Sequence, residues 1–158
     1  MDKTMNGENS MAEKINMKGN LEKGLRLMGE GRPGDAISYF EAILADGGLN
    51  PLAMSCLGLA MARAGKNLAA AEQYCLKAID KKPYAGEFYR SLAEVYFIGG
   101  KKADAIECLN RGLRYDNDNS ELYEEMKQYG IRRKPPIPFL PRSNILNKKI
   151  GKLISSLK

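Results

Sequence analysis

A helical pattern that recurs about every 34 residues constrains the fold of this chain more than any other feature. The most regular copy covers residues 86–119 and contains two stretches with apolar residues at helical spacing. Gly99 and Gly100 separate the two stretches, and a polar run ends the copy. The spaced residues are Tyr89, Leu92, Ala93 and Tyr96, followed by Ala105, Leu109, Gly112 and Leu113. The pattern predicts two antiparallel amphipathic helices.

Two earlier copies, residues 17–50 and 51–85, carry the same pattern. Gly58 lies 34 residues after Gly24, and Ala93 lies 35 residues after Gly58. A small residue at this place lets paired helices approach closely. The second copy opens with Asn50 as a helix N-cap and Pro51 at the first helical position. The chain is therefore predicted to be all-α.

The motif Tyr89-x2-Leu92-Ala93-x2-Tyr96, then Ala105-x3-Leu109, resembles the tetratricopeptide repeat. The resemblance implies a right-handed superhelix, or α-solenoid, of three helix-turn-helix repeats. A helix over 120–131, apolar on one side, is predicted to cap the third repeat. We therefore expect a flexible N-terminal segment (1–16), a repeat domain (17–133) and a tail (134–158).

In this family, the first helix of each repeat lines a concave groove that binds peptides. Carried onto this sequence, the groove residues implied by the resemblance come from three helices. They are Lys18, Leu21, Leu25, Met28, Leu52, Ser55, Leu59, Ala62, Arg63, Glu87, Arg90, Glu94, Phe97 and Ile98. The alternative is that Leu21, Leu25 and Met28 pack on the N-terminal segment or within the core.

Chaperone adaptors of this family hold a carboxylate with Lys and Asn side chains. Here Leu21, Leu25, Ser55 and Leu59 stand where that clamp is expected, so we predict that the clamp is absent. The groove is instead apolar with a charged end, which favours an apolar or amphipathic peptide from a protein partner. The chain is predicted to be an adaptor, scaffold or chaperone-like module. Its size and repeat number also resemble small secretion chaperones.

The tail concentrates the basic charge of the chain. The chain has 25 Lys and Arg against 19 Asp and Glu, and eight of the basic residues but no acidic one lie after residue 129. A proline-rich spacer, 134–141, precedes a candidate amphipathic helix capped by Ser143 or Asn144. Its apolar side has Leu146, Ile150, Leu153, Ile154 and Leu157, and its basic side has Lys148, Lys149 and Lys152.

Three partners are conceivable for this tail helix. It could dock on the groove of its own or a neighbouring molecule, or it could lie on an anionic membrane as the anchor of a membrane-associated assembly factor. The lack of interleaved aromatic residues disfavours nucleic acid. Docking on protein ranks first and the membrane second.

No residue pattern predicts catalysis, a metal site or a cofactor. The chain has no His, the commonest general base and metal ligand. Three Cys occur, at 56, 75 and 108, without a CxxC pair, and we interpret them as small buried thiols in a reducing compartment. The polar N-terminus has no apolar run typical of a secretory signal, so we expect a non-enzymatic cytoplasmic protein.

Overall fold

A computed structural model describes residues 5–45, 49–129 and 144–156 of the chain. The described part consists of α-helices and contains no strand. The helices are α1 (Met5–Gly29), α2 (Pro33–Ala45), α3 (Pro51–Arg63), α4 (Leu68–Lys81), α5 (Gly86–Ile98), α6 (Lys102–Tyr115), α7 (Ser120–Gln128) and α8 (Ile145–Ser156). This architecture confirms the predicted all-α class and the helix pairs of the three repeats.

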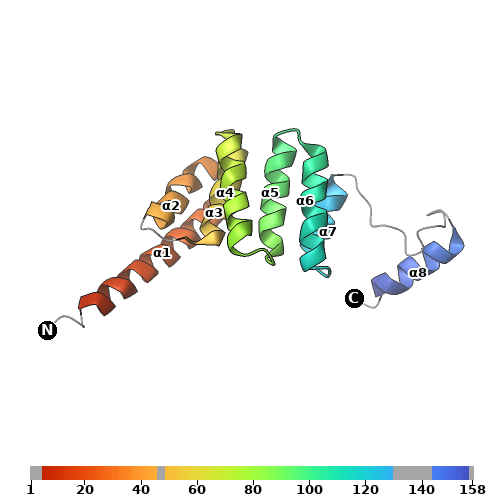
Figure 1. Ribbon diagram of the computed structural model, residues 1–158, viewed down its shortest axis with the longest axis horizontal. Coiled ribbons are helices and arrows are strands. Elements are labelled where there is room, and N and C mark those ends of the chain that lie inside the picture. Colours follow the sequence, from red (N-terminus) through yellow and green to blue (C-terminus); the bar gives the residue numbers. More distant parts are fainter. Residues whose placement is uncertain (1–4, 46–48, 130–143, 157–158) are drawn as a thin grey trace.

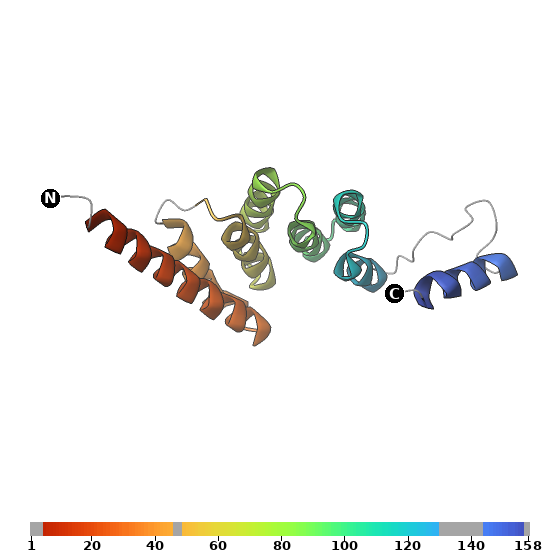
Figure 2. The ribbon, with the colours of Figure 1, turned by 90° about the horizontal axis from the view of Figure 1, so that it is seen from below.

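The helix pairs α1/α2, α3/α4 and α5/α6 stack side by side, and α7 follows the last pair (Figure 1). Seen from below, α1, α3, α5 and α7 lie on one side of the stack, whereas α4 and α6 lie on the other (Figure 2). Each first helix contacts the first helix of the next repeat, α1 to α3 and α3 to α5. The stack is therefore a solenoid with one surface built from first helices.

The turn inside each repeat depends on a glycine. Gly31, Gly65 and Gly100 have φ angles of 73°, 65° and 74°. In the second repeat, the Gly65 amide donates to the Ala62 carbonyl at 3.0 Å, and the Lys66 amide donates to the Met61 carbonyl at 2.9 Å. This hydrogen-bond pair closes the helix end on a left-handed residue, a conformation that glycine adopts without strain. The recurring glycine thus sets where each first helix ends.

The paired helices meet at small residues. A Cβ added at Gly58 would lie 2.5 Å from the Ala71 carbonyl oxygen and 2.6 Å from the Cys75 sulfur. In the first repeat, a Cβ at Gly24 would lie 2.6 Å from the Phe40 ring. The small residues at the repeated position therefore let α3 approach α4, and α1 approach α2, as the spacing predicted.

The core has two clusters of buried apolar residues that share α3. The first joins α1, α2 and α3 through Phe40, Ile43 and Leu57, and the second runs from α3 to α7. Leu122, which is fully buried, and Met126 attach α7 to the second cluster. The capping helix therefore covers the apolar flank of the third repeat, as predicted, although α7 ends at Gln128.

The N-terminal segment 1–16, which was expected to be flexible, is helical over its described part. Residues 5–16 form the first turns of α1, which continues without interruption to Gly29. The stretch contains no proline, and Ala12, Glu13 and Lys14, which adjoin the packed part of α1, have high helix propensity. Propensity does not account for the first turn, which contains Asn6 and Gly7. The spacer 134–141 lies outside the described residues.

Candidate functional site

A cavity of about 270 Å³ opens on the surface formed by the first helices of the three repeats. Its apolar side chains come from α1 and α3, and its charged side chains come from α3 and α5. The lining residues are Leu25, Met28, Gly29, Leu52, Ser55, Cys56, Leu59, Arg63, Glu87, Arg90 and Ser91. Residues about thirty positions apart in the sequence thus converge on one site.

The apolar floor of the cavity is only partly covered by the rest of the protein. Leu25 is 44% exposed, and Met28, Leu52 and Leu59 are half-buried. Leu25 and Met28 lie three residues apart on α1, and Leu52 and Leu59 lie seven apart on α3, so each pair shares a helix face. The cavity therefore offers an apolar surface to a ligand.

Two ion pairs link neighbouring helices across this surface. The Arg63 guanidinium of α3 donates to both carboxylate oxygens of Glu94 on α5, at 2.6 and 2.8 Å. The hydrogen bonds to Glu94 raise the pKa of Arg63. Farther along, Arg90 Nη1 lies 2.8 Å from Glu121 Oε2 of α7. The charged end of the cavity is thus electrostatically balanced by neighbouring carboxylates.

Several residues implied by the resemblance do line the cavity, whereas others lie elsewhere. Ser55 lines it but is 1% exposed. Leu21 packs against the cluster of α1, α2 and α3, which corresponds to the alternative considered for it. Ala62 is a correction: it is 1% exposed and belongs to the core cluster that runs from α3 to α7, so its side chain is not available to a ligand.

Phe97 and Ile98 lie beyond the lining of the cavity, although both are exposed. The Phe97 ring stacks on Tyr129 with a centroid separation of 4.2 Å and an interplanar angle of 13°. Tyr129 follows α7 directly and donates a hydrogen bond to Glu125. The groove implied by the resemblance thus divides into this cavity and a separate aromatic contact at the capping helix.

Three lining residues, Gly29, Cys56 and Ser91, were not expected from the sequence. Each directly follows a residue that the resemblance placed in the groove. Adjacent residues of a helix can both line a concave surface, because such a surface contacts a wide part of the helix circumference. Cys56 was interpreted as a buried thiol but is half-buried at this site, whereas Cys75 and Cys108 are buried. Burial raises the pKa of Cys56 to about 11, so the thiol is protonated at neutral pH.

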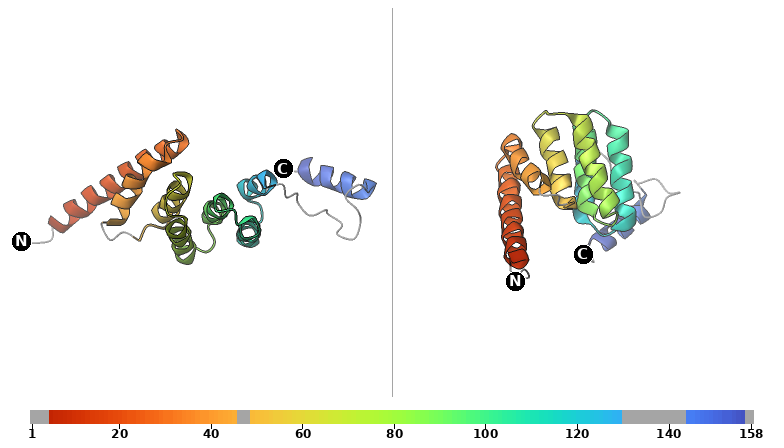
Figure 3. Two further views of the ribbon diagram at one scale, coloured as in Figure 1. Left: turned by 90° about the horizontal axis from the view of Figure 1, so that it is seen from above. Right: turned by 60° about the vertical axis from the view of Figure 1, so that its left-hand side comes forward.

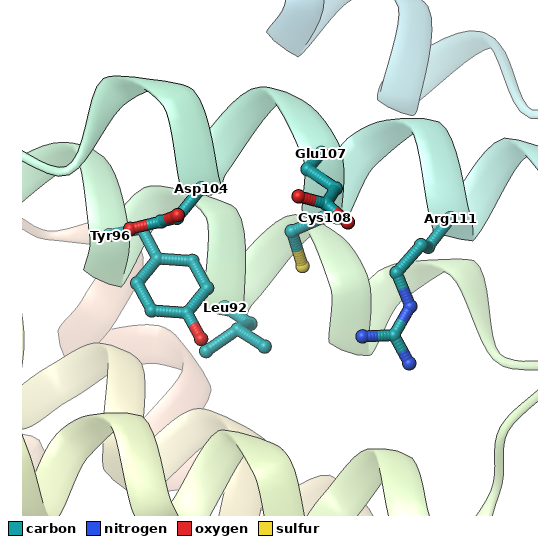
Figure 4. Close-up of a pocket in the computed structure, with 6 residues that line it drawn as sticks. All are labelled: Leu92, Tyr96, Asp104, Glu107, Cys108 and Arg111. Carbon is teal, nitrogen blue, oxygen red and sulfur yellow. The ribbon is translucent and has the colours of Figure 1, made fainter.

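A second cavity, of about 180 Å³, lies against α5 and α6 (Figure 4). Its lining combines Leu92, Tyr96, Asp104, Glu107, Cys108 and Arg111. Burial raises the pKa values of Tyr96 and Cys108 to about 12. Neither group is therefore ionised at neutral pH, and the cavity offers no thiolate or phenolate nucleophile.

Among residues 5–45, 49–129 and 144–156, no group of three or more His, Cys, Asp or Glu side chains could hold a metal ion. None of the described helices has the combination of length and apolar character that crossing a bilayer requires.

The predicted tail helix corresponds to α8. The Leu146 amide donates to the Asn144 side-chain oxygen at 2.9 Å, so Asn144 caps the helix. Leu146 and Leu153 are exposed, as are Lys148, Lys149 and Lys152, whereas Ile150 is half-buried. The side chain of Ile154 and the whole of Leu157 lie outside the described residues. Within the described part of the chain, α8 has no contact with α1–α7.

Comparison with protein families identifies the repeats. Residues 21–86 match the model of the tetratricopeptide repeat family. No curated protein matches the sequence.

Solved structures match a larger part of the chain. The first tetratricopeptide-repeat domain of Spaghetti (RPAP3), bound to the HSP90 peptide SRMEEVD, is 22% identical with a TM-score of 0.62, covering 73% of this chain and 94% of that one. The second such domain of human RPAP3, in complex with the HSP70 peptide SGPTIEEVD, is 18% identical with a TM-score of 0.63, covering 76% and 99%. The Aspergillus fumigatus Sgt2 domain is 14% identical with a TM-score of 0.63, covering 90% and 83%. These likenesses establish the fold.

Proposed function

Since this chain is a tetratricopeptide-repeat protein, with matching sequence over residues 21–86 and the fold of such domains, we propose that it is a non-enzymatic protein-interaction module. Its ligand is an apolar or amphipathic peptide segment of a partner protein. The observation that carries the proposal is the cavity between α1, α3 and α5, whose floor exposes apolar side chains to solvent. A partly exposed apolar patch with a charged border is typical of a protein-binding surface.

The apolar floor accounts for the affinity of such a module. Burial of a Leu-sized side chain contributes about 1.5–3 kcal/mol, so three or four anchors over Leu25, Met28 and Leu59 give gross stabilisation of roughly 5–12 kcal/mol. Ordering of the peptide and loss of its free motion oppose this gain. We expect micromolar binding.

The charged residues of the cavity supply orientation. Arg90 and Glu121 form a solvent-exposed pair, with side chains 41% and 64% exposed, and such pairs contribute little to stability. The Arg90 guanidinium can therefore exchange Glu121 for a carboxylate or carbonyl of the ligand at small net cost. Arg63 and Glu94 are held more firmly by their two hydrogen bonds and fix the border of the cavity.

The ligand class proposed here differs from the peptides in the RPAP3 structures. Those peptides end in Glu-Glu-Val-Asp, a sequence with three carboxylate side chains. Here α1 and α3 present Leu25 and Leu59 to the cavity, and Arg63 is held by the carboxylate of Glu94. These features support an apolar ligand and a chaperone-like or scaffolding role, including the shielding of apolar segments as in secretion chaperones. We propose a cytoplasmic location because the three thiols, which are free, suit a reducing compartment.

Selection from a random-peptide display library tests the proposal. We expect selected peptides to be rich in Leu, Ile, Met and Phe, and to lose at least about tenfold in affinity for Leu25→Glu, because a carboxylate then faces their apolar side. Leu49→Glu is the matched control, since Leu49 is 64% exposed and does not line the cavity. Equal binding to both variants, or selection of acidic peptides, would contradict the proposal.

A further inference from the structure

Helix α8 has an apolar side that none of the other described helices covers, with Ile150 half-buried on it. Leu146 and Leu153 are 54% and 60% exposed. Along the described parts of the chain, no other helix contacts α8, which lies beyond α7 in Figures 1 and 3. Leu146, Ile150 and Leu153 follow each other at intervals of four and three residues, so they share one helix face. The face is a continuous apolar stripe.

The other side of α8 is basic. Lys148 and Lys152 are exposed and lie away from the apolar stripe, and Lys149, also exposed, lies at its edge. The sequence after residue 129 contains eight Lys and Arg and no Asp or Glu. The residues before it carry 17 basic against 19 acidic side chains, so the positive charge of the protein is concentrated in the tail.

We propose that α8 binds the surface of an anionic lipid bilayer. The helix lies in the plane of the interface, with Leu146, Ile150 and Leu153 in the acyl boundary and the lysines among the anionic headgroups. A strongly amphipathic helix with a lysine-rich polar side binds membranes in this way, through buried apolar area together with electrostatic attraction.

The positive charge of α8 favours an anionic bilayer over the cavity between α1, α3 and α5 as its binding site. The charged side chains that line this cavity are Arg63, Arg90 and Glu87. Glu94 and Glu121 lie near the arginines but are paired with them. Once the two pairs are set aside, the cavity offers a lysine-rich helix only the single carboxylate of Glu87, whereas an anionic bilayer presents many negative charges. This inference concerns a second surface of the protein and does not depend on peptide binding in the cavity.

Co-sedimentation of the full chain with vesicles tests this inference. The vesicles contain equal parts of phosphatidylcholine and phosphatidylglycerol, and vesicles of phosphatidylcholine alone serve as the comparison. We expect binding to the anionic vesicles at low ionic strength and its loss at high salt, because salt screens the attraction. Failure to bind anionic vesicles at low salt would overturn the inference.

Matched variants locate the binding to α8. Reversal of Lys148, Lys149 and Lys152 to Glu is expected to lower the partition onto anionic vesicles by about a hundredfold or more. Reversal of the exposed Lys66, Lys82 and Lys102 changes the net charge by the same amount, and the partition should remain much closer to that of the wild type. Equal losses in the two triple variants would show that only net charge matters and would overturn the assignment to α8.

A fluorescent probe then separates lipid binding from docking on protein. Because the chain contains no Trp, Leu153→Trp introduces a single reporter into the apolar stripe. We expect a blue shift of its emission on addition of the anionic vesicles, and no shift for Leu49→Trp, whose side chain is exposed on the repeat domain. The emission of the Leu153→Trp variant without lipid is then compared with that of the double variant Leu25→Glu/Leu153→Trp. If the single variant is already blue-shifted and the double variant emits at longer wavelength, α8 occupies the cavity and the inference is wrong.

Discussion

Arg63 of α3 and Glu94 of α5 form a two-hydrogen-bond ion pair that joins the second repeat to the third, with donor–acceptor distances of 2.6 and 2.8 Å. Their side chains are 40% and 22% exposed, so the pair is only partly in water. Fork-shaped pairing of a guanidinium with a carboxylate is stronger than a single contact. The pair therefore contributes to the interface between repeats as well as to the border of the cavity.

A double-mutant cycle of Arg63→Met and Glu94→Gln is expected to give a coupling energy of about 1 kcal/mol in the free energy of unfolding, measured in urea. The same cycle on Lys18 and Glu22 is the control, because this pair is 3.9 Å apart with side chains 79% and 67% exposed. We expect a coupling of about 0.3 kcal/mol there. Equal couplings in the two cycles would show that Arg63 and Glu94 are merely a surface pair.

Replacement of glycine by alanine is expected to change the free energy of unfolding in opposite directions at Gly58, where two helices are in contact, and at Gly19. Gly58→Ala is expected to lower the free energy of unfolding by about 2–3 kcal/mol, since the new Cβ would meet the Ala71 carbonyl and the Cys75 sulfur at 2.5 and 2.6 Å. Gly19→Ala is expected to raise it by about 0.5–1 kcal/mol, because Gly19 is in α1 and nothing lies within 4 Å of its added Cβ. Urea unfolding measured by circular dichroism checks both signs.

The buried thiols predict a loss of stability at alkaline pH. Burial raises the pKa of Cys108 from its ordinary value of 9.0 to about 12, and it also raises the pKa of Cys75. The unfolded chain thus releases these protons at lower pH than the folded chain. The folded state therefore keeps its full stability with respect to these thiols below pH 9, and the free energy of unfolding decreases as the pH rises from 9 toward 12.

Urea unfolding at a series of pH values above 9 measures this effect. Cys108→Ala is expected to reduce the slope of the unfolding free energy by about 1.4 kcal/mol per pH unit between pH 9 and 12. The slope is the informative quantity, because loss of the sulfur also removes packing at every pH. An unchanged slope would mean that Cys108 ionises equally easily in both states.

The sequence predicts the helices of this fold well because their limits depend on local interactions. The turn glycines Gly31, Gly65 and Gly100 and the N-caps Asn50 and Asn119 act within one turn of their own position. The spacing of apolar residues then identifies which side of each helix is buried. Most repeat limits were therefore predictable without knowledge of the tertiary structure.

The candidate site was only partly predictable, because its limits depend on neighbouring helices. The position of Ala62 on α3 suggested a place in the groove, but Ala62 packs in the core that extends to α5 and α7. Phe97 was expected to bind a ligand, yet its ring meets Tyr129, a contact across 32 positions of sequence. No local pattern encodes such a pairing. The beginning of α1 at Met5 was missed because residues 5–16 are mostly polar and contain no run of apolar residues.

The stacked pair of Phe97 and Tyr129 predicts how firmly the capping helix is held. Phe97→Ala is expected to lower the free energy of unfolding by about 1–2 kcal/mol, because it removes a ring contact at 4.2 Å together with apolar area. Ile98→Ala is the matched control, since Ile98 is the next residue and is 41% exposed against 43% for Phe97. We expect its loss to be at most half as large.

Limited proteolysis tells whether the effect of Phe97→Ala is local. The stacking ties the end of α7 to α5, so its removal should accelerate cleavage within residues 120–129 while the first two repeats keep the wild-type rate. Tyr129→Ala should accelerate the same cleavage, and the double variant should add little to either single change. Additive effects of the two substitutions would show that each ring is held by other neighbours and that the stack does not fasten the capping helix.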